Sequence, residues 1–133
     1  MSGPERMPCA VAAAETGSRW WVLAARAQRT KRGDTVDHAD LYGLAGEVVA
    51  TLRALDELAG VLVRQTAYYG VGRALRDDEG ADPAERIDQA ASAADALGAD
   101  VVGAARHANA YWSAIGHIGL DLRDEERPEG GTP

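Results

Sequence analysis

The sequence of 133 residues predicts an all-α fold, in which a long antiparallel helical hairpin is joined to a short N-terminal helix. Two observations predict the hairpin. Residues 41–72 and 87–118 each carry apolar or small residues at seven-residue spacing, the pattern of helices that bury one stripe against a neighbour. A turn signal separates the two stretches, so the helices are expected to lie antiparallel. We expect dimerisation to complete a four-helix-type bundle.

The N-terminal part is expected to hold a flexible leader over residues 1–17 and a short helix over residues 18–29. Two prolines and two glycines favour an irregular leader. Ser18 is a suitable helix cap, and Trp20, Leu23 and Ala24 then fall on one face. A loop around Gly33 ends this part of the chain.

The first long helix is expected over residues 37–78, with Asp37 as its cap and a kink near residues 70–72, where Gly70 and Gly72 weaken helical structure. Its seven-residue pattern has two rows, which we expect to face the second helix. They consist of Leu41, Val48, Leu55, Leu62 and Tyr69, and of Leu44, Thr51 and Leu58. Further apolar residues lie outside both rows and predict an oligomer interface at Val49, Val61, Val63 and Tyr68.

The second long helix is expected over residues 83–119. Asp82 is placed to cap it, Pro83 suits the first helical position, and Glu85 occupies the third position, as in a capping box. Its two expected seam rows are Ile87, Ala94, Val101, Ala108 and Ile115, and Ala90, Leu97, Ala104, Tyr111 and Ile118. Residues 121–133 are acidic and contain proline and glycine, so a disordered tail is expected. Residues 18–120 thus form the single expected helical domain.

The apolar composition favours self-association. The hydrophobic fraction is 46%, yet the chain contains no phenylalanine. Alanine-rich seams release less transfer free energy per residue than leucine or phenylalanine, so a short bundle gains from burying more surface in an oligomer. Only Lys31 of the 14 basic residues is a lysine, an arginine bias typical of a bacterium with a high-GC genome.

The net charge of −7 is unevenly distributed. Residues 1–33 contain six basic and two acidic residues, a charge of +4, whereas residues 34–133 contain eight basic and 19 acidic residues, a charge of −11. A basic arm of this kind could bind nucleic acid or another anion, or fold onto its own acidic hairpin. The candidate contacts are Arg19, Arg26, Arg29, Lys31 and Arg32.

The motifs of common enzymes and cofactor sites are missing from the sequence. Neither glycine-rich phosphate loop occurs, and no histidine has partners at metal-ligand spacing. Cys9 is the single cysteine, so it has no partner for an internal disulfide. No stretch is long and apolar enough to span a membrane, and a cytoplasmic location is expected. We expect no catalytic residue, cofactor or metal.

The favoured hypothesis is therefore a non-enzymatic helical interaction protein, an accessory, adaptor or regulator that acts as a homo-oligomer with an unidentified protein partner. Three alternatives stay open. The first is a nucleic-acid-associated regulator or mobile-element accessory protein that uses the basic arm. The second is an acidic immunity or antitoxin-like protein, supported by the acidic body. The third is a helical bundle with a small-ligand pocket at Arg106, His107, Tyr111 and Trp112.

Overall fold

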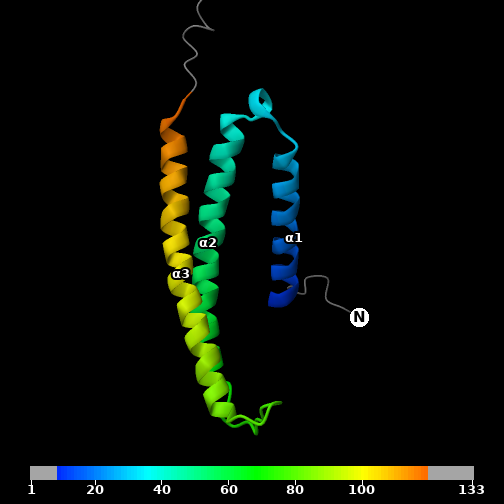
Figure 1. Cartoon of the computed structure of the whole chain (residues 1–133), viewed down its shortest axis with the longest axis vertical. Helices are drawn as coiled ribbons and strands as arrows, with labels where there is room; N and C mark the ends of the chain where they lie inside the picture. The colour runs from blue at the N-terminus through cyan, green and yellow to red at the C-terminus, as the bar shows by residue number, and fades with distance from the viewer. Residues whose placement is uncertain (1–8, 120–133) are drawn as a thin grey trace, which may run out of the picture. The chain divides into compact units, whose positions relative to one another are not determined.

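The computed structural model describes residues 9–119, and this part of the chain is helical without strands. Its helices are α1 (Ala10–Arg29), a 3₁₀ turn η1 (Gly33–Thr35), α2 (His38–Ala67) and α3 (Pro83–His117). The chain divides into two units, residues 1–37 and residues 38–133. The second unit is the predicted hairpin, in which α2 and α3 run antiparallel and pack side by side (Figure 1).

Helix α1 begins eight residues before the predicted start at Ser18. The Cys9 Sγ accepts a hydrogen bond from the Ala12 N–H at 3.4 Å, and the alanine-rich segment that follows has high helix propensity. Ser18 is not a cap, because its hydroxyl donates to the carbonyl oxygen of Glu15 within the helix. Of the predicted leader, residues 10–17 are therefore helical, while residues 1–8 lie outside the described residues.

Helix α2 ends at Ala67, eleven residues before the predicted end at residue 78. The expected kink at residues 70–72 is instead part of a series of turns that leads out of the helix. Gly72 has a positive φ of 74°, which a left-handed turn requires and which glycine adopts without steric cost. The helix therefore ends before the glycine pair, which lies in the turns that follow it and not at a kink within a longer helix.

Helix α3 begins as the sequence predicts. The Asp82 carboxylate accepts a hydrogen bond from the Ala84 N–H at 3.0 Å, and Pro83 occupies the first turn. The helix ends at His117, close to the predicted end at residue 119. The predicted acidic tail, residues 121–133, lies outside the described residues.

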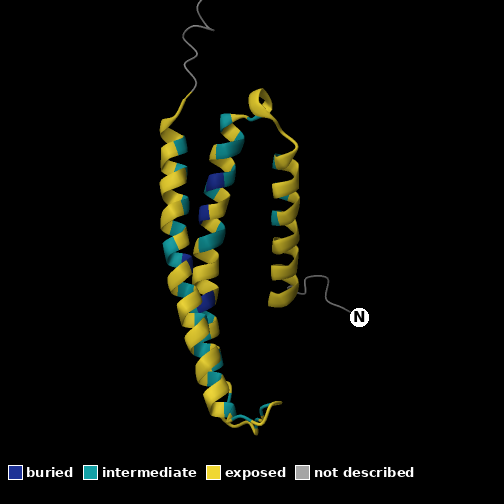
Figure 2. Ribbon diagram, in the orientation of Figure 1, coloured by how far each residue is buried: buried dark blue, intermediate teal, exposed yellow. Residues whose placement is uncertain are grey.

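The core of the hairpin is small and lies along the line where α2 and α3 meet (Figure 2). Among the described residues only four apolar side chains are fully buried: Ala45, Val49, Ala59 and Val101. Three of the four lie on α2, and none is larger than valine. A core of this size stabilises a small helical unit only weakly.

Candidate functional site

The seam between α2 and α3 consists mostly of small residues. Most buried or half-buried positions of α3 follow an alternating spacing of four and three: Ile87, Ala91, Ala94, Gly98, Val101, Ala105, Ala108, Trp112 and Ile115; Pro83, Val102 and Gly103 are half-buried outside it. The matching positions of α2 are Ala45, Val49, Leu52, Ala59, Val63 and Thr66, and Gly70 continues the series in the turns that follow the helix. This spacing is that of a left-handed helical pair.

On both helices, predicted seam residues lie one position before the residues that form the observed seam. On α2 the two predicted rows lie one residue before the observed seam, so Leu55 and Leu62 are exposed while Val63 is half-buried. On α3 the predicted row from Ile87 to Ile115 is confirmed, but its partner row is also displaced by one residue. Because one residue turns a helix by 100°, the displaced rows point to the side of the hairpin.

The displaced row on α2 forms what we call the leucine row. Its members are Leu41, Leu44, Val48, Thr51, Leu55, Leu58 and Leu62. Val48, Leu55, Leu58 and Leu62 are between 36% and 43% exposed, which is high for side chains with this spacing. Large aliphatic residues at heptad spacing normally face a partner helix. Within the hairpin, these four members of the row are thus exposed, whereas Leu41, Leu44 and Thr51 are half-buried.

The displaced row on α3 lies on the same side of the hairpin as the leucine row. Tyr111 of this row lines a hollow of about 150 Å³ together with Leu41, Leu44 and Val48. For antiparallel helices this is expected, because a shift of one residue in the same chain direction turns both helices toward one side. We call this surface the open face; it comprises the leucine row together with Leu97, Asp100, Ala104, His107 and Tyr111.

The other side of the hairpin has a different character. A hollow of about 290 Å³ there is lined by Asp56 and Asp95 together with small and apolar residues such as Val63, and a hollow of about 260 Å³ includes Arg53, Asp56 and Arg106. Charged side chains of both signs therefore surround the grooves on this side. The open face is distinguished by its apolar content, which favours an interface with another helical surface.

The predicted oligomer interface needs correction. Val49 is only 1% exposed and belongs to the core of the hairpin, so it is not accessible to a partner. Val61 and Val63 are half-buried, and Val63 lines a hollow between α2 and α3. Tyr68 is 72% exposed but follows the last residue of α2. Among the exposed apolar side chains, those with helix-seam spacing on α2 are Val48, Leu55, Leu58 and Leu62, which the sequence assigned to the internal seam.

The predicted ligand-pocket residues are not brought together. Tyr111 lines the hollow on the open face, whereas Arg106 lines a separate hollow with Arg53 and Asp56. Trp112 belongs to a third hollow of about 310 Å³, which Asn109, Ser113 and His117 also line. His107 is exposed. These four side chains do not converge on one ligand.

An aromatic cluster lies where α2 begins and α3 ends, opposite the loop that connects the two helices. Sequence reasoning did not predict it. The ring centroids of His38 and Tyr42 are 6.2 Å apart, and those of Tyr42 and Trp112 are 5.8 Å apart. Two glycines make room for the rings: a Cβ at Gly46 would lie 3.2 Å from the Trp112 indole, and one at Gly116 would lie 3.0 Å from Tyr42. The signal is the pairing of each ring with a glycine on the opposite helix.

Polar groups at this end are only partly satisfied. His38 Nε2 lies 2.8 Å from the carbonyl oxygen of Ile115, so the ring donates a hydrogen bond from α2 to α3. The indole Nε1 of Trp112 is buried and has no hydrogen-bond partner. Because Nε1 would lie only 3.3 Å from a Cβ at Gly46, it packs against α2. The cluster holds the two helices together at this end.

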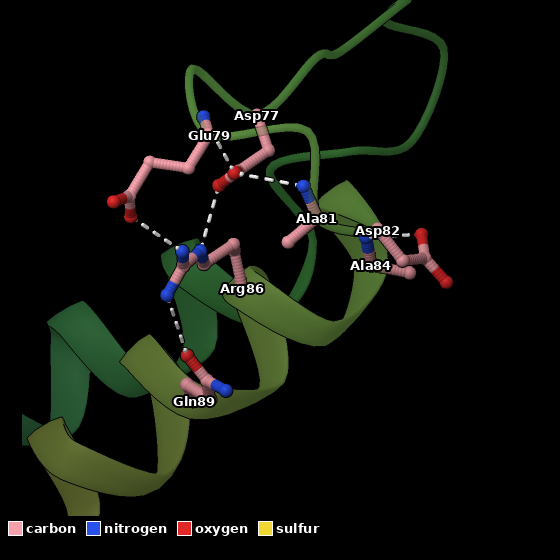
Figure 3. Close-up of polar contacts among 7 residues, drawn as sticks. All are labelled: Asp77, Glu79, Ala81, Asp82, Ala84, Arg86 and Gln89. Atoms are coloured by element: carbon pink, nitrogen blue, oxygen red, sulfur yellow. Dashed lines mark hydrogen bonds and ion pairs between the residues drawn. The ribbon is translucent and has the colours of Figure 1, made fainter.

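The loop between α2 and α3 is organised around one arginine (Figure 3). Arg86 donates from Nε to Asp77 Oδ1 at 2.7 Å and from a terminal nitrogen to Glu79 at 2.8 Å. The other oxygen of Asp77 accepts from the backbone N–H groups of Glu79 and Ala81. The Arg86 hydrogen bond, followed by these backbone hydrogen bonds, lowers the pKa of the Asp77 carboxyl from its usual value.

Within residues 9–119, three neighbouring acidic residues, Asp77, Asp78 and Glu79, are the one group close enough to share a metal ion. Asp77 and Glu79 already pair with Arg86. The acidic group is thus explained by loop structure.

The basic arm lies partly on α1. Arg19 forms an exposed pair with Glu15 at 3.7 Å, and Arg26 and Arg29 lie in the last turn of the helix. Lys31 and Arg32 follow the helix, next to η1. No residue of α1 is buried, and Trp20 is 65% exposed. Binding of nucleic acid by this arm stays a prediction.

Comparisons with protein-family models, curated proteins and solved structures found no match to this chain. In the part of the chain that the structure describes, none of the helices is long and apolar enough to cross a membrane. The candidate site therefore rests on the geometry of the hairpin, and its strongest element is the open face.

Proposed function

We propose that this chain is a non-enzymatic helical interaction protein that acts as a homo-oligomer through its open face. The observation that carries the proposal is the exposed leucine row. Leu55, Leu58 and Leu62 are each at least 40% exposed, although their spacing is that of a helix seam. Covering such a row releases about 25 cal/mol for each Å² of apolar surface removed from water.

The small core of the hairpin supports the same proposal. Its buried side chains are no larger than valine, whereas the larger aliphatic side chains lie outside the core. An arrangement of this kind is typical of a unit that gains much of its stability by association. In this role, the chain serves as an accessory, adaptor or regulator whose folded state depends on a partner helix surface.

The test is sedimentation of the full chain at micromolar concentration, with a pair of substituted variants. Leu55→Glu combined with Leu58→Glu places two charges on the leucine row and is expected to raise the dimer dissociation constant by roughly a hundredfold or more. The matched control, Ala96→Glu with Ala110→Glu, adds the same charges at exposed positions outside the seam and outside the open face.

We expect the control to associate like the unmodified chain, because its charges stay in water. Circular dichroism checks that both variants remain helical. A chain that sediments as a monomer throughout, or a leucine-row variant that associates as strongly as its control, would contradict the proposed function.

A further inference from the structure

The open face is self-complementary about a single two-fold axis. Within the hairpin, Gly98 lies beside Ala59 and Gly70 lies beside Ile87, so the residue numbers of facing positions on α2 and α3 add to 157. Position 104 on α3 is therefore level with position 53 on α2. Position 104 is the midpoint of the row on α3, and position 53 lies within two residues of the midpoint of the leucine row.

Six of the seven members of the leucine row pair symmetrically about position 53, while Leu41 falls opposite Gln65. Pairs at equal distance before and after this point are Thr51 with Leu55, Val48 with Leu58, and Leu44 with Leu62. If a second copy lies antiparallel on the first, each member of a pair faces the other member in the partner. This is the condition for an isologous interface, in which one surface binds its own copy.

The residues of α3 on the open face are arranged in similar pairs before and after Ala104. Leu97 and Tyr111 each lie seven residues from Ala104, and Asp100 and His107 lie four and three residues from it. In an antiparallel pair with Ala104 at the axis, Leu97 therefore faces Tyr111 of the second copy. The Asp100 carboxylate of each copy then faces the His107 imidazole of the other copy, so the pair occurs twice in the dimer.

We propose that the occupant of the open face is a second copy of this chain, bound antiparallel about a two-fold axis at Ala104, with Asp100 of each copy paired to His107 of the other. The proposal rests on the proposed function and adds the partner and the geometry. An imidazole N–H donates to a carboxylate, so the pair satisfies both polar groups on an otherwise apolar surface. The leucine rows then lie against each other, α2 on α2.

The available area fits a dimer. The leucine row from Leu41 to Leu62 is about 32 Å long at 1.5 Å per residue, and two adjacent helices are about 20 Å wide. The open face therefore offers roughly 600 Å² per copy, or about 1,200 Å² in total. That value lies at the lower end of the range for specific, stable interfaces.

The first experiment is oxidative cross-linking of the full chain with Cys9→Ser as background. Ala104→Cys places one thiol at the axis, and we expect a disulfide-linked dimer to form. The matched control is Ala99→Cys, an exposed alanine on the same helix that lines the hollow with Asp56 and Asp95. It is expected to give no linked dimer at the same protein concentration.

The second experiment tests the polar pair. His107→Asp places two carboxylates opposite each other in two places and is expected to weaken dimerisation by roughly tenfold or more. The exchanged variant, Asp100→His with His107→Asp, restores both pairs and is expected to return the dissociation constant to within about threefold of its original value.

The outcomes separate the two proposals. A dimer that does not cross-link at position 104, or that the exchanged variant does not restore, overturns the antiparallel geometry and leaves the proposed function standing. A chain that stays monomeric overturns both. A monomer in which Leu55→Cys links to Leu23→Cys of the same chain would identify α1 as the occupant and equally contradict a second copy.

Discussion

Gly46 and Trp112 show how single residues determine the fit of the hairpin. A Cβ at Gly46 would lie 3.2 Å from the indole ring, closer than side chains normally pack, whereas a Cβ at Gly43 would meet nothing within 4 Å. The glycine at position 46 therefore gives the tryptophan its place, and the glycine at position 43 does not. The indole in turn covers the end of the hairpin where His38 donates to Ile115.

The same substitution at both glycines tests this difference. Gly46→Val is expected to lower the free energy of unfolding by about 1–3 kcal/mol, because the branched side chain overpacks the tryptophan. Gly43→Val is expected to change it by less than about 0.5 kcal/mol, since valine and glycine differ little in helix propensity. Urea unfolding followed by circular dichroism measures both. Equal effects at the two positions would argue against the packing of Trp112 on Gly46.

Asp77 is the residue whose titration should affect the loop. Its pKa in the folded chain is lowered, because the charged carboxylate accepts hydrogen bonds from Arg86 and from two backbone groups. A lowered pKa means that the charged form stabilises the fold. This contribution is present in full above the ordinary value of 3.8 and is lost as the pH falls through the lowered pKa.

Asp77→Asn is therefore expected to lower the urea midpoint at pH 7, and this effect is expected to shrink as the pH falls through the lowered pKa, where the original carboxyl becomes protonated as well. Asp78→Asn serves as the control, because it lies in the same loop and the hydrogen bonds of Figure 3 do not involve it. If the Asp77 variant lost as much stability in acid as at neutral pH, the carboxylate would not hold the loop.

At the scale of the helices, the central feature is the displacement of the seam by one residue. The sequence correctly predicts an all-helical chain, two long helices that pack together, and a second helix that starts at Asp82 and Pro83. It does not identify which row is internal, because the seam and the leucine row have the same seven-residue spacing. Sequence reasoning selects the larger residues, and the structure uses the smaller ones.

The physical reason lies in how closely the helices approach each other. Small residues such as Ala45, Ala59 and Gly98 let α2 and α3 pack closely over much of their length. Placing the leucines in the seam would hold the helices further apart. The helix ends were also hard to predict: α1 begins early since its alanines favour helix, and α2 ends at Ala67, before the turns that contain Gly70 and Gly72.

Alanine substitutions in the two rows of α2 should show which row packs inside the hairpin and which contacts a partner, because only the second effect depends on protein concentration. Val49→Ala is expected to lower the free energy of unfolding by about 1–3 kcal/mol at every protein concentration, because Val49 is fully buried inside the hairpin. Leu55→Ala is expected to have that effect only at concentrations where the chain associates. Urea unfolding at two widely separated protein concentrations provides the measurement. A concentration-independent cost at Leu55 would place it in the internal seam.

At the scale of the whole molecule, we interpret the hairpin as an incomplete helical bundle. The hairpin pairs the charged groups of its loop and packs its aromatic end by itself, while its open face exposes leucines at helix-seam spacing. A surface of this kind favours association, and its symmetry about Ala104 favours a second copy. The acidic charge of residues 34–133 acts against indiscriminate association, so the apolar rows and the Asp100–His107 pairs would have to select the partner.

The most direct test of this account is the molar mass of the unmodified chain in solution, measured by light scattering over a dilution series from about 100 to about 1 μM. We predict a mass of twice 14.0 kDa at the upper end, falling toward 14.0 kDa on dilution. The Leu55→Glu, Leu58→Glu variant should remain at 14.0 kDa throughout. A mass of 14.0 kDa for the unmodified chain at every concentration would contradict the account.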